Sequence, residues 1–189
     1  MPRTMEIRPG MSPEQIYEHM EPIEGLKVEL LGGRLVMTGS ASIRHNDTVW
    51  LLVLALVEVA RSAGWRVLTD QAVHIAATRD RLKPDLLVVP PRAPSYDKNE
   101  LLSDGVLMVA EVVSPGSQDE DRHGKPRYYA QGKVPLYLLV DIEATPPSVT
   151  LFARPKAGKY QDQVTVEMGQ ALSLPLPIGV TLDTKALAG

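Results

Sequence analysis

The sequence predicts an α/β (α+β) domain in which helices flank a mixed central β-sheet. Three observations support this fold class. The segment 43–63 repeats apolar residues at helical spacing. Several apolar runs of strand length follow it, and two of them, 85–89 and 106–113, are almost wholly apolar, which is typical of strands covered on both faces. The 189 residues suit one domain, 1–189, with its core over about 12–166.

The N-terminal part predicts a short helix and then a hairpin. Ser12 begins a Ser-Pro-Glu-Gln sequence, in which Ser12 and Gln15 form a capping box and proline fits the first helical position. The pair Gly32-Gly33 separates the apolar runs 26–31 and 34–37. Glycine reaches positive φ without a Cβ penalty, so this pair favours a tight hairpin turn.

The remaining elements follow from apolar periodicity and from the positions of glycine and proline. We expect a helix over 43–63, strands over 65–68, 71–75, 85–89, 106–113 and 136–140, a helical segment over 119–131, and an edge hairpin over 149–153 and 160–166. The proline-rich stretch 90–104 predicts a loop of functional length. The tail, rich in proline and leucine, permits no assignment.

Composition excludes several classes of protein. There are 20 Lys and Arg against 23 Asp and Glu, a formal charge of −3, so nucleic-acid binding would need a local basic patch. The absence of cysteine excludes disulfides, thiolate metal sites and cysteine nucleophiles, and it fits a cytoplasmic location. Residues 1–10 lack the apolar core of a signal peptide, and the longest apolar stretch, 49–60, is interrupted by Glu58 and too short to span a bilayer. We therefore expect no membrane partner.

Two carboxylates occur where burial makes them costly. Glu111 interrupts the apolar run 106–113, and Asp85 opens the run 85–89 directly after Pro84. A buried carboxylate needs a cationic partner or a metal. If the two strands are neighbours, both acids can share a divalent cation, which prefers oxygen ligands. The alternatives are a turn role for Asp85 and a core ion pair with arginine for Glu111.

Cationic residues follow in the segment 119–131. Lys125 lies fourteen residues after Glu111 and could orient a metal-bound water or stabilise charge on a phosphate, although a solvated helix lysine is the commoner case. Arg122 and Arg127 could contact phosphates, and Tyr128 could stack on bases or position the lysine or the substrate. The following residue, Tyr129, is expected to pack against the sheet.

Several blocks of the sequence carry a family resemblance. They are Val28-Glu-Leu-Leu-Gly-Gly-Arg-Leu-Val-Met37, Arg44-His45-Asn46, Pro84-Asp85, Glu111-Val-Val-Ser-Pro115, Asp121 with Lys125, Tyr128, and Gly132-Lys-Val-Pro-Leu-Tyr-Leu-Leu-Val-Asp141. Together they resemble the Uma-type group of predicted endonucleases, within the PD-(D/E)XK restriction-endonuclease-like superfamily. The similarity extends from about Ser12 to Phe152.

The resemblance implies a restriction-endonuclease-like core and Mg²⁺-dependent hydrolysis of phosphodiesters, with Mn²⁺ as a substitute metal. It implies Asp85 and Glu111 as metal ligands, and we expect the Val112 carbonyl as a further one. The superfamily places a lysine two residues after the second acid, where this chain has Val113. Lys125 on the following helix takes that role by resemblance, although Pro126 requires that the helix either kinks there or begins near Lys125.

Two further residues join the expected site. Glu29 matches a family acid in the first hairpin and could complete the metal site directly or through water. Its alternative is an exposed strand residue. His45, at the start of the long helix, could bind phosphate or relay a proton. Its alternative is a helix N-terminal histidine bonded to a nearby loop.

The expected function is therefore a metal-dependent DNA endonuclease. One rival is a nucleic-acid-binding module on a nuclease fold that does not cut. The other is a protein-interaction subunit that uses the proline-rich loop from Pro90. We expect a homodimer, because cutting both strands needs two sites and isologous dimers are common.

Overall fold

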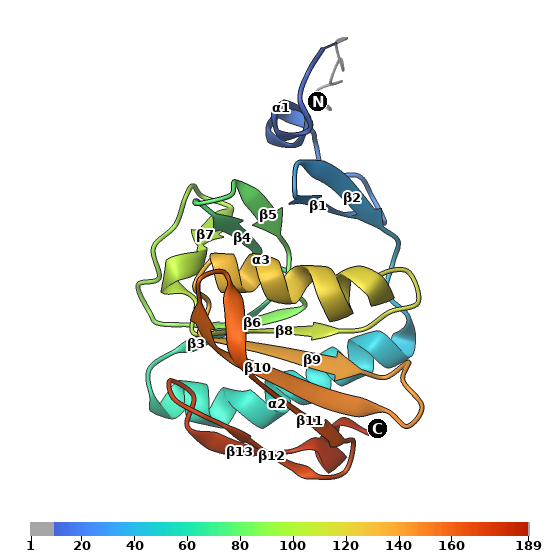
Figure 1. The fold of residues 1–189 in the computed structure, drawn as a ribbon, viewed down its shortest axis with the longest axis vertical. Helices are drawn as coiled ribbons and strands as arrows, with labels where there is room; N and C mark the ends of the chain where they lie inside the picture. Colours follow the sequence, from blue (N-terminus) through green and yellow to red (C-terminus); the bar gives the residue numbers. More distant parts are fainter. Residues whose placement is uncertain (1–9, 189) are drawn as a thin grey trace.

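The computed structural model describes residues 10–188. The prediction that residues 1–10 are not a signal peptide therefore falls almost wholly outside the described residues. The helices are α1 (Pro13–His19), α2 (Ile43–Ser62) and α3 (Lys125–Gln131). The strands are β1 (Lys27–Leu31), β2 (Arg34–Thr38), β3 (Arg66–Thr69), β4 (Ala72–Ile75), β5 (Asp80–Leu82), β6 (Leu86–Val89), β7 (Glu100–Leu102), β8 (Met108–Val112), β9 (Leu136–Asp141), β10 (Ser148–Lys156), β11 (Lys159–Glu167), β12 (Ala171–Leu174) and β13 (Val180–Asp183). Figure 1 shows their arrangement.

The main sheet has the mixed topology that the sequence predicts. Its six strands run in the order β11-β10-β9-β8-β6-β3, with β8 and β9 parallel and the other neighbours antiparallel. The helices α2 and α3 lie on opposite sides of it (Figure 1). Along the central strand β8, Met108 and Ala110 face the core beneath α2, whereas Val109 faces the core beneath α3. This alternation turns the side chain of Glu111 towards α3.

A second sheet was not expected. Its five strands run in the order β2-β1-β5-β4-β7, and only β4 and β7 are parallel. The prediction of a loop over 90–104 is therefore wrong in part, because β7 lies within it and pairs with β4. Three residues are too few for a recognisable periodicity. The strand forms because Leu101 is buried in the core beneath α3.

The predicted local elements are confirmed. Ser12 and Gln15 make the capping box of α1, and Gly32 and Gly33 turn the first hairpin with φ of 56° and 74°. The segment 119–131 is helical in two parts, a π-helical turn over Glu120–Gly124 and then α3. The helix begins at Lys125, so Pro126 lies in its first turn, where its missing N–H costs little.

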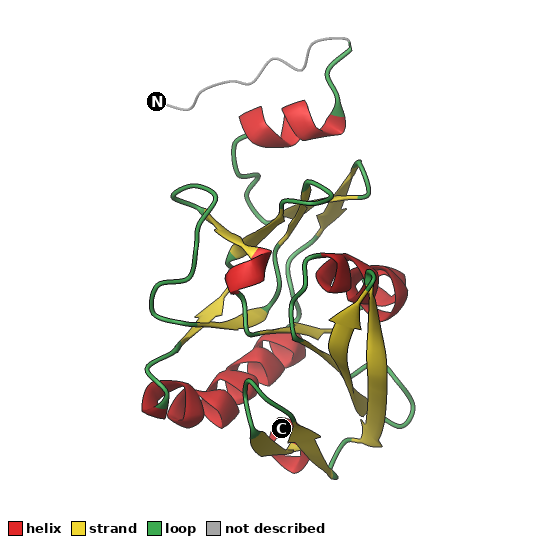
Figure 2. Ribbon diagram, turned by 60° about the vertical axis from the view of Figure 1, so that its left-hand side comes forward, coloured by secondary structure: helices red, strands yellow, loops and turns green. Residues whose placement is uncertain are grey.

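The unassigned tail forms a small third layer. The strands β12 and β13 pair as a hairpin beside α2 (Figure 2), and their leucines join the core beneath that helix. Within residues 10–188, none of the helices combines the length and apolar character that crossing a membrane requires.

Candidate active site

The two expected acids come from neighbouring antiparallel strands. Asp85 directly precedes β6, and Glu111 lies on β8. The register pairs Leu86 with Ala110, so its continuation sets Asp85 opposite Glu111. The condition for a shared cation, that the two strands are neighbours, is met.

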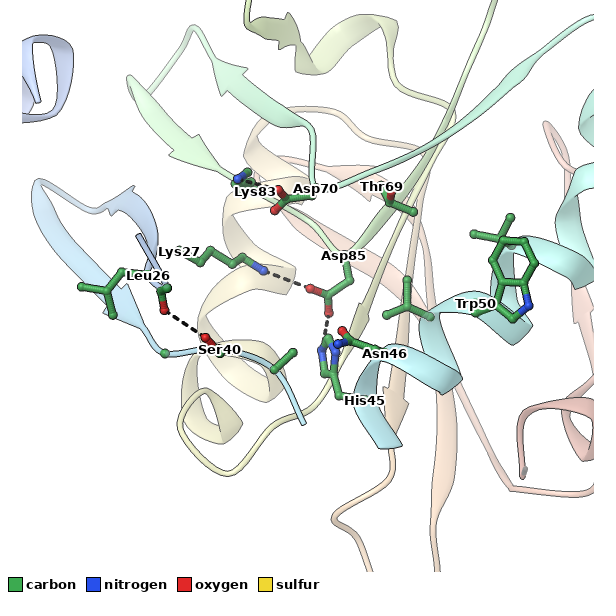
Figure 3. Close-up of a pocket in the computed structure, with 15 residues that line it drawn as sticks. Leu26, Lys27, Ser40, His45, Asn46, Trp50, Thr69, Asp70, Lys83 and Asp85 are labelled. Carbon is green, nitrogen blue, oxygen red and sulfur yellow. Dashed lines mark hydrogen bonds and ion pairs between the residues drawn. The ribbon is translucent and has the colours of Figure 1, made fainter. Parts of the chain in front are cut away.

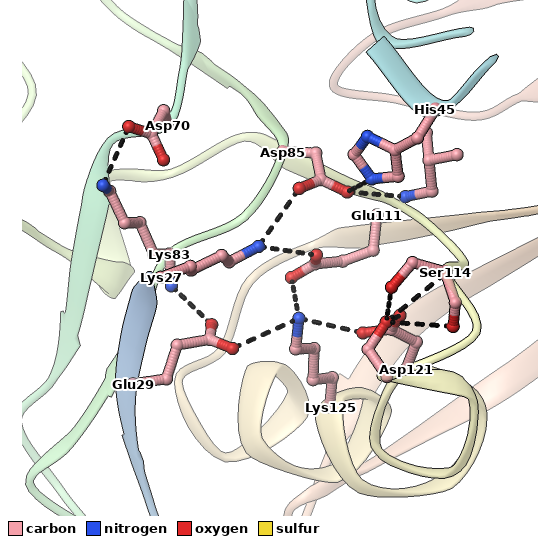
Figure 4. A network of polar contacts seen from close by, with 12 residues as sticks. Lys27, Glu29, His45, Asp70, Lys83, Asp85, Glu111, Ser114, Asp121 and Lys125 are labelled. Carbon is pink, nitrogen blue, oxygen red and sulfur yellow. Dashed lines mark hydrogen bonds and ion pairs between the residues drawn. The ribbon is translucent and has the colours of Figure 1, made fainter. Parts of the chain in front are cut away.

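One ammonium group contacts both acids. The Nζ atom of Lys27 lies 3.1 Å from Asp85 Oδ1 and 3.7 Å from Glu111 Oε2 (Figure 4). Partial burial opposes the charge of Lys27, but the neighbouring carboxylates raise its pKa above the ordinary value. The two carboxyl groups are therefore close enough to be neutralised by a single cation.

Asp85 has two further hydrogen-bond donors. His45 Nε2 lies 3.1 Å from Oδ2, and the Val112 backbone N–H donates to the same oxygen at 2.8 Å. Burial alone would raise the pKa of the Asp85 carboxyl, but Lys27 and the hydrogen bond from His45 outweigh it and hold the pKa well below its ordinary value. Asp85 is therefore ionised near neutral pH.

Glu111 is fully enclosed. Its Oε1 atom is 2.9 Å from Lys125 Nζ and accepts a hydrogen bond from the Tyr129 hydroxyl, also at 2.9 Å. Burial raises the pKa of Glu111 to about 7, against the opposing effects of Lys125 and Lys27. This carboxyl therefore titrates near neutral pH.

Lys125 is surrounded by carboxylates. Besides Glu111, its Nζ lies 2.9 Å from Asp121 Oδ1 and 3.5 Å from Glu29 Oε2 (Figure 4). Burial would lower its pKa, but these acids, Glu111 first, raise the pKa well above the ordinary value. The side chain of Lys125 is 3% exposed, whereas that of Lys27 is 22% exposed. Of these two ammonium groups, Lys27 is thus the one that solvent reaches.

Glu29 and His45 also join the site. Glu29 is buried and accepts the Lys83 backbone N–H at 2.7 Å, so it is not an exposed strand residue. His45 lies in the first turn of α2, where Ser42 caps the helix by accepting the His45 backbone N–H. Burial lowers the pKa of His45, but its hydrogen bond to Asp85 and the charge of Asp85 raise the pKa above the ordinary value overall.

The three residues expected to contact substrate take no part in the ion pairs around Asp85, Glu111 and Lys125. Arg122 makes a bidentate pair with Asp141, at 2.7 and 3.1 Å. Arg127 is exposed on α3. Tyr128 packs over the first hairpin, where a Cβ built on Gly32 would meet its hydroxyl at 2.9 Å. Their contact with substrate stays a prediction.

Three members of the cluster were not singled out as site residues from the sequence, and one of them, Asp121, appears there only in a block that carries the family resemblance. Lys27 lies two residues before Glu29 on β1, a spacing that puts both side chains on one face of the strand. Tyr129 lies one helical turn after Lys125, which likewise puts both on one face of α3. These spacings were available signals, but apolar packing was the commoner explanation for the tyrosine.

The donor set fits a hard divalent cation. Asp85 and Glu111 offer carboxylate oxygens that already share one positive charge, the Lys27 ammonium. Among residues 10–188, no group of three or more His, Asp and Glu side chains has metal-binding geometry. Two carboxylates would leave such a cation coordination positions for water or substrate, as Mg²⁺ commonly has.

Comparison with known proteins identifies similar sequences and folds. A family model, Uma2, with the description "Putative restriction endonuclease", matches residues 14–185. No curated protein matches the chain. A solved structure from Anabaena variabilis, described as "a putative nuclease belonging to DUF820", superposes with a TM-score of 0.74 at 14% sequence identity. The match covers 94% of this chain and 97% of that one, and it shows the same fold.

Proposed function

The chain belongs to the Uma2 family, "Putative restriction endonuclease", and on this premise we propose that it is a metal-dependent nuclease that hydrolyses DNA phosphodiester bonds. One observation carries the proposal. Asp85 Oδ1 and Glu111 Oε2, from different strands, lie 3.1 and 3.7 Å from the same ammonium nitrogen. A pair of acids that one cation can neutralise is the donor set that this chemistry needs.

The metal site proposed here consists of the Asp85 and Glu111 carboxylates with the Val112 carbonyl. Mg²⁺ or Mn²⁺ bound there would polarise the phosphoryl group and lower the pKa of a bound water. Asp85 is ready for this role because it is ionised near neutral pH. The Val112 N–H and His45 hold its Oδ2 atom in place.

The two lysines have separable tasks in this proposal. Lys125 is buried among Glu111, Glu29 and Asp121, so it holds those acids in position and neutralises part of their charge. Lys27 is partly exposed beside Asp85, so it is the ammonium that can contact a phosphate oxygen. His45 would relay a proton through its Nε2 atom, which lies 3.1 Å from Asp85 Oδ2.

Cleavage of supercoiled plasmid with Mn²⁺ tests the proposal. We expect nicked or linear product from the wild type, and a loss of at least about 100-fold in rate for Glu111→Ala, because a metal ligand is removed. Asp119→Asn is the matched control, since Asp119 is an exposed acid that pairs with the exposed His123. Equal cleavage by the wild type and Glu111→Ala would overturn the proposal.

A module that binds nucleic acid without cutting is the second candidate. The low net basicity of the chain, a formal charge of −3, favours it. Such a module need not take up Mg²⁺ or Mn²⁺, and it would bind DNA equally well after Asp85→Ala.

A further inference from the structure

A pocket of about 510 Å³ opens beside the candidate active site. Asp85, His45 and Lys27 line it. Val49 and Val53, which lie one and two turns after His45 on α2, line it as well. Its walls therefore combine the polar groups of the site with an apolar helix face (Figure 3). A volume of this size is within the range of small-molecule sites, about 300–1,000 Å³, and can hold a nucleotide unit.

Trp50 also lines this pocket and is largely exposed. Its side chain comes from α2, and the residue is 59% exposed. In the view of Figure 3, Asp85 lies between Lys27 and Trp50. A large exposed aromatic surface is costly in water unless a ligand covers it, and an indole ring suits the flat face of a nucleobase.

The pocket has little free positive charge with which to hold a duplex backbone. Lys27 can contact a single phosphate oxygen, but its charge is already shared with Asp85 and Glu111, and Lys83 Nζ lies 2.8 Å from Asp70 Oδ2. Binding through phosphates alone needs unpaired cations. Affinity at this pocket must therefore come largely from nonpolar contact.

We infer that the pocket takes an unpaired nucleotide of single-stranded DNA and that the base stacks on Trp50. In a duplex each base is stacked and paired within the helix, so its face is not free to cover an indole ring. This inference rests on the proposed function, because the nuclease chemistry at Asp85 is what calls for a phosphodiester beside Trp50. It makes Trp50 a residue that selects unpaired strands.

Tryptophan fluorescence gives a direct test. In a Trp65→Phe background the remaining tryptophan is Trp50. A single-stranded oligonucleotide and the duplex of the same sequence are titrated in EDTA, which prevents metal-assisted cleavage. We expect the single strand to quench Trp50 and to bind at least about tenfold more tightly than the duplex.

Substitutions then separate stacking from general binding. Because variants at position 50 lack this fluorophore, their binding is measured by the anisotropy of a dye-labelled oligonucleotide. Trp50→Ala should weaken single-strand binding by about 5- to 150-fold, as loss of a base-stacking aromatic does, and Trp50→Phe should restore most of it. Leu54→Ala is the matched control, because Leu54 is 50% exposed on the same helix and is not among the residues that line the pocket. It should bind as the wild type does.

Several outcomes would overturn the inference. They are equal affinity for duplex and single strand, wild-type binding by Trp50→Ala, tighter binding of RNA of the same sequence, or Trp50 emission that depends on protein concentration alone, as burial by a second copy would produce. The proposed function fails separately. If the wild type cuts duplex plasmid at a rate that Trp50→Ala does not change, the stacking role is wrong and the proposed nuclease function stands. If a single strand stacks on Trp50 but no DNA is cleaved with Mn²⁺, the nuclease function is wrong and the stacking role stands.

Discussion

At the scale of single residues, the candidate site is an alternation of acids and ammonium groups. Lys27 lies between Asp85 and Glu111, and Lys125 lies between Glu111 and Glu29. Each buried carboxylate thus has a cationic partner, which is the condition under which buried charge is tolerated. A divalent cation at the proposed site would therefore compete with Lys27 for the same two oxygens.

Lys27→Met tests this competition. Removing the ammonium leaves Asp85 and Glu111 facing each other, so we expect the apparent Kd for Mn²⁺ to fall by at least about fivefold, equivalent to ~1 kcal/mol. Isothermal titration calorimetry measures the Kd. Lys27→Arg keeps the charge and should bind Mn²⁺ about as the wild type does. Weaker Mn²⁺ binding by Lys27→Met than by Lys27→Arg would contradict a shared site.

At the scale of elements, the first hairpin and α3 position the acids through a close contact. Tyr128 lies over the turn at Gly32, while one residue further on Tyr129 donates to Glu111. The hairpin also carries Glu29 to Lys125. The turn therefore sets the distance between β1 and α3, and with it the geometry of the buried ion pairs.

Two alanine substitutions at this turn separate strain from contact. Gly32 and Gly33 both have positive φ, so alanine at either costs about 1–2 kcal/mol of stability. At Gly32 a Cβ also meets the Tyr128 hydroxyl, whereas at Gly33 nothing lies within 4 Å. We expect Gly32→Ala to destabilise by about 1 kcal/mol more than Gly33→Ala in urea unfolding.

Tyr128→Phe removes the atom that the new Cβ would meet. In the Gly32→Ala background it should recover most of that additional loss. If the two glycine variants unfold at the same urea concentration, the hairpin does not press on Tyr128 and the turn does not set this spacing.

At the scale of the whole molecule, two buried groups contribute to stability in opposite directions as the pH changes. Burial raises the pKa of Glu111 to about 7 from an ordinary 4.5, so the folded state binds more protons between these values and stability falls as pH rises through them. Burial and Arg81 lower the pKa of His74 to about 4 from 6.5, so this group contributes stability that increases over pH 4–6.5. Glu111 in the main sheet and His74 in the second sheet therefore change the free energy of unfolding in opposite directions.

Glu111→Gln should expose the effect of His74. The glutamine cannot titrate, so we expect the free energy of unfolding of the variant, relative to the wild type, to rise by up to about 3 kcal/mol between pH 4.5 and 7. Urea unfolding in EDTA at several pH values measures it. Parallel pH profiles for the two proteins would show that Glu111 titrates normally.

The homodimer also belongs to this scale and stays a prediction that sedimentation can check.

Prediction from the sequence succeeded where a short segment holds the whole cause. The capping box at Ser12, the Gly32-Gly33 turn and the apolar stripe of α2 are written within a few residues, and each element forms as expected. The apolar runs around Asp85 and Glu111 also marked both acids as in need of a cation, although only Glu111 is buried and Asp85 is half-buried. The chain by itself therefore determined the fold class and the two central acids.

Tertiary structure decided which charges meet. Long-range pairing, of β5 with β1 and of β7 with β4, satisfies the backbone groups of these two short strands, and three residues carry no periodicity that would reveal this. Likewise, β1, β6, β8 and α3 must pack together before Lys27 can reach two acids and Lys125 three. Charges attract over distances set by the folded backbone and not by separation along the chain. For that reason the sequence determined the charged groups, and only the packed sheets decided their partners.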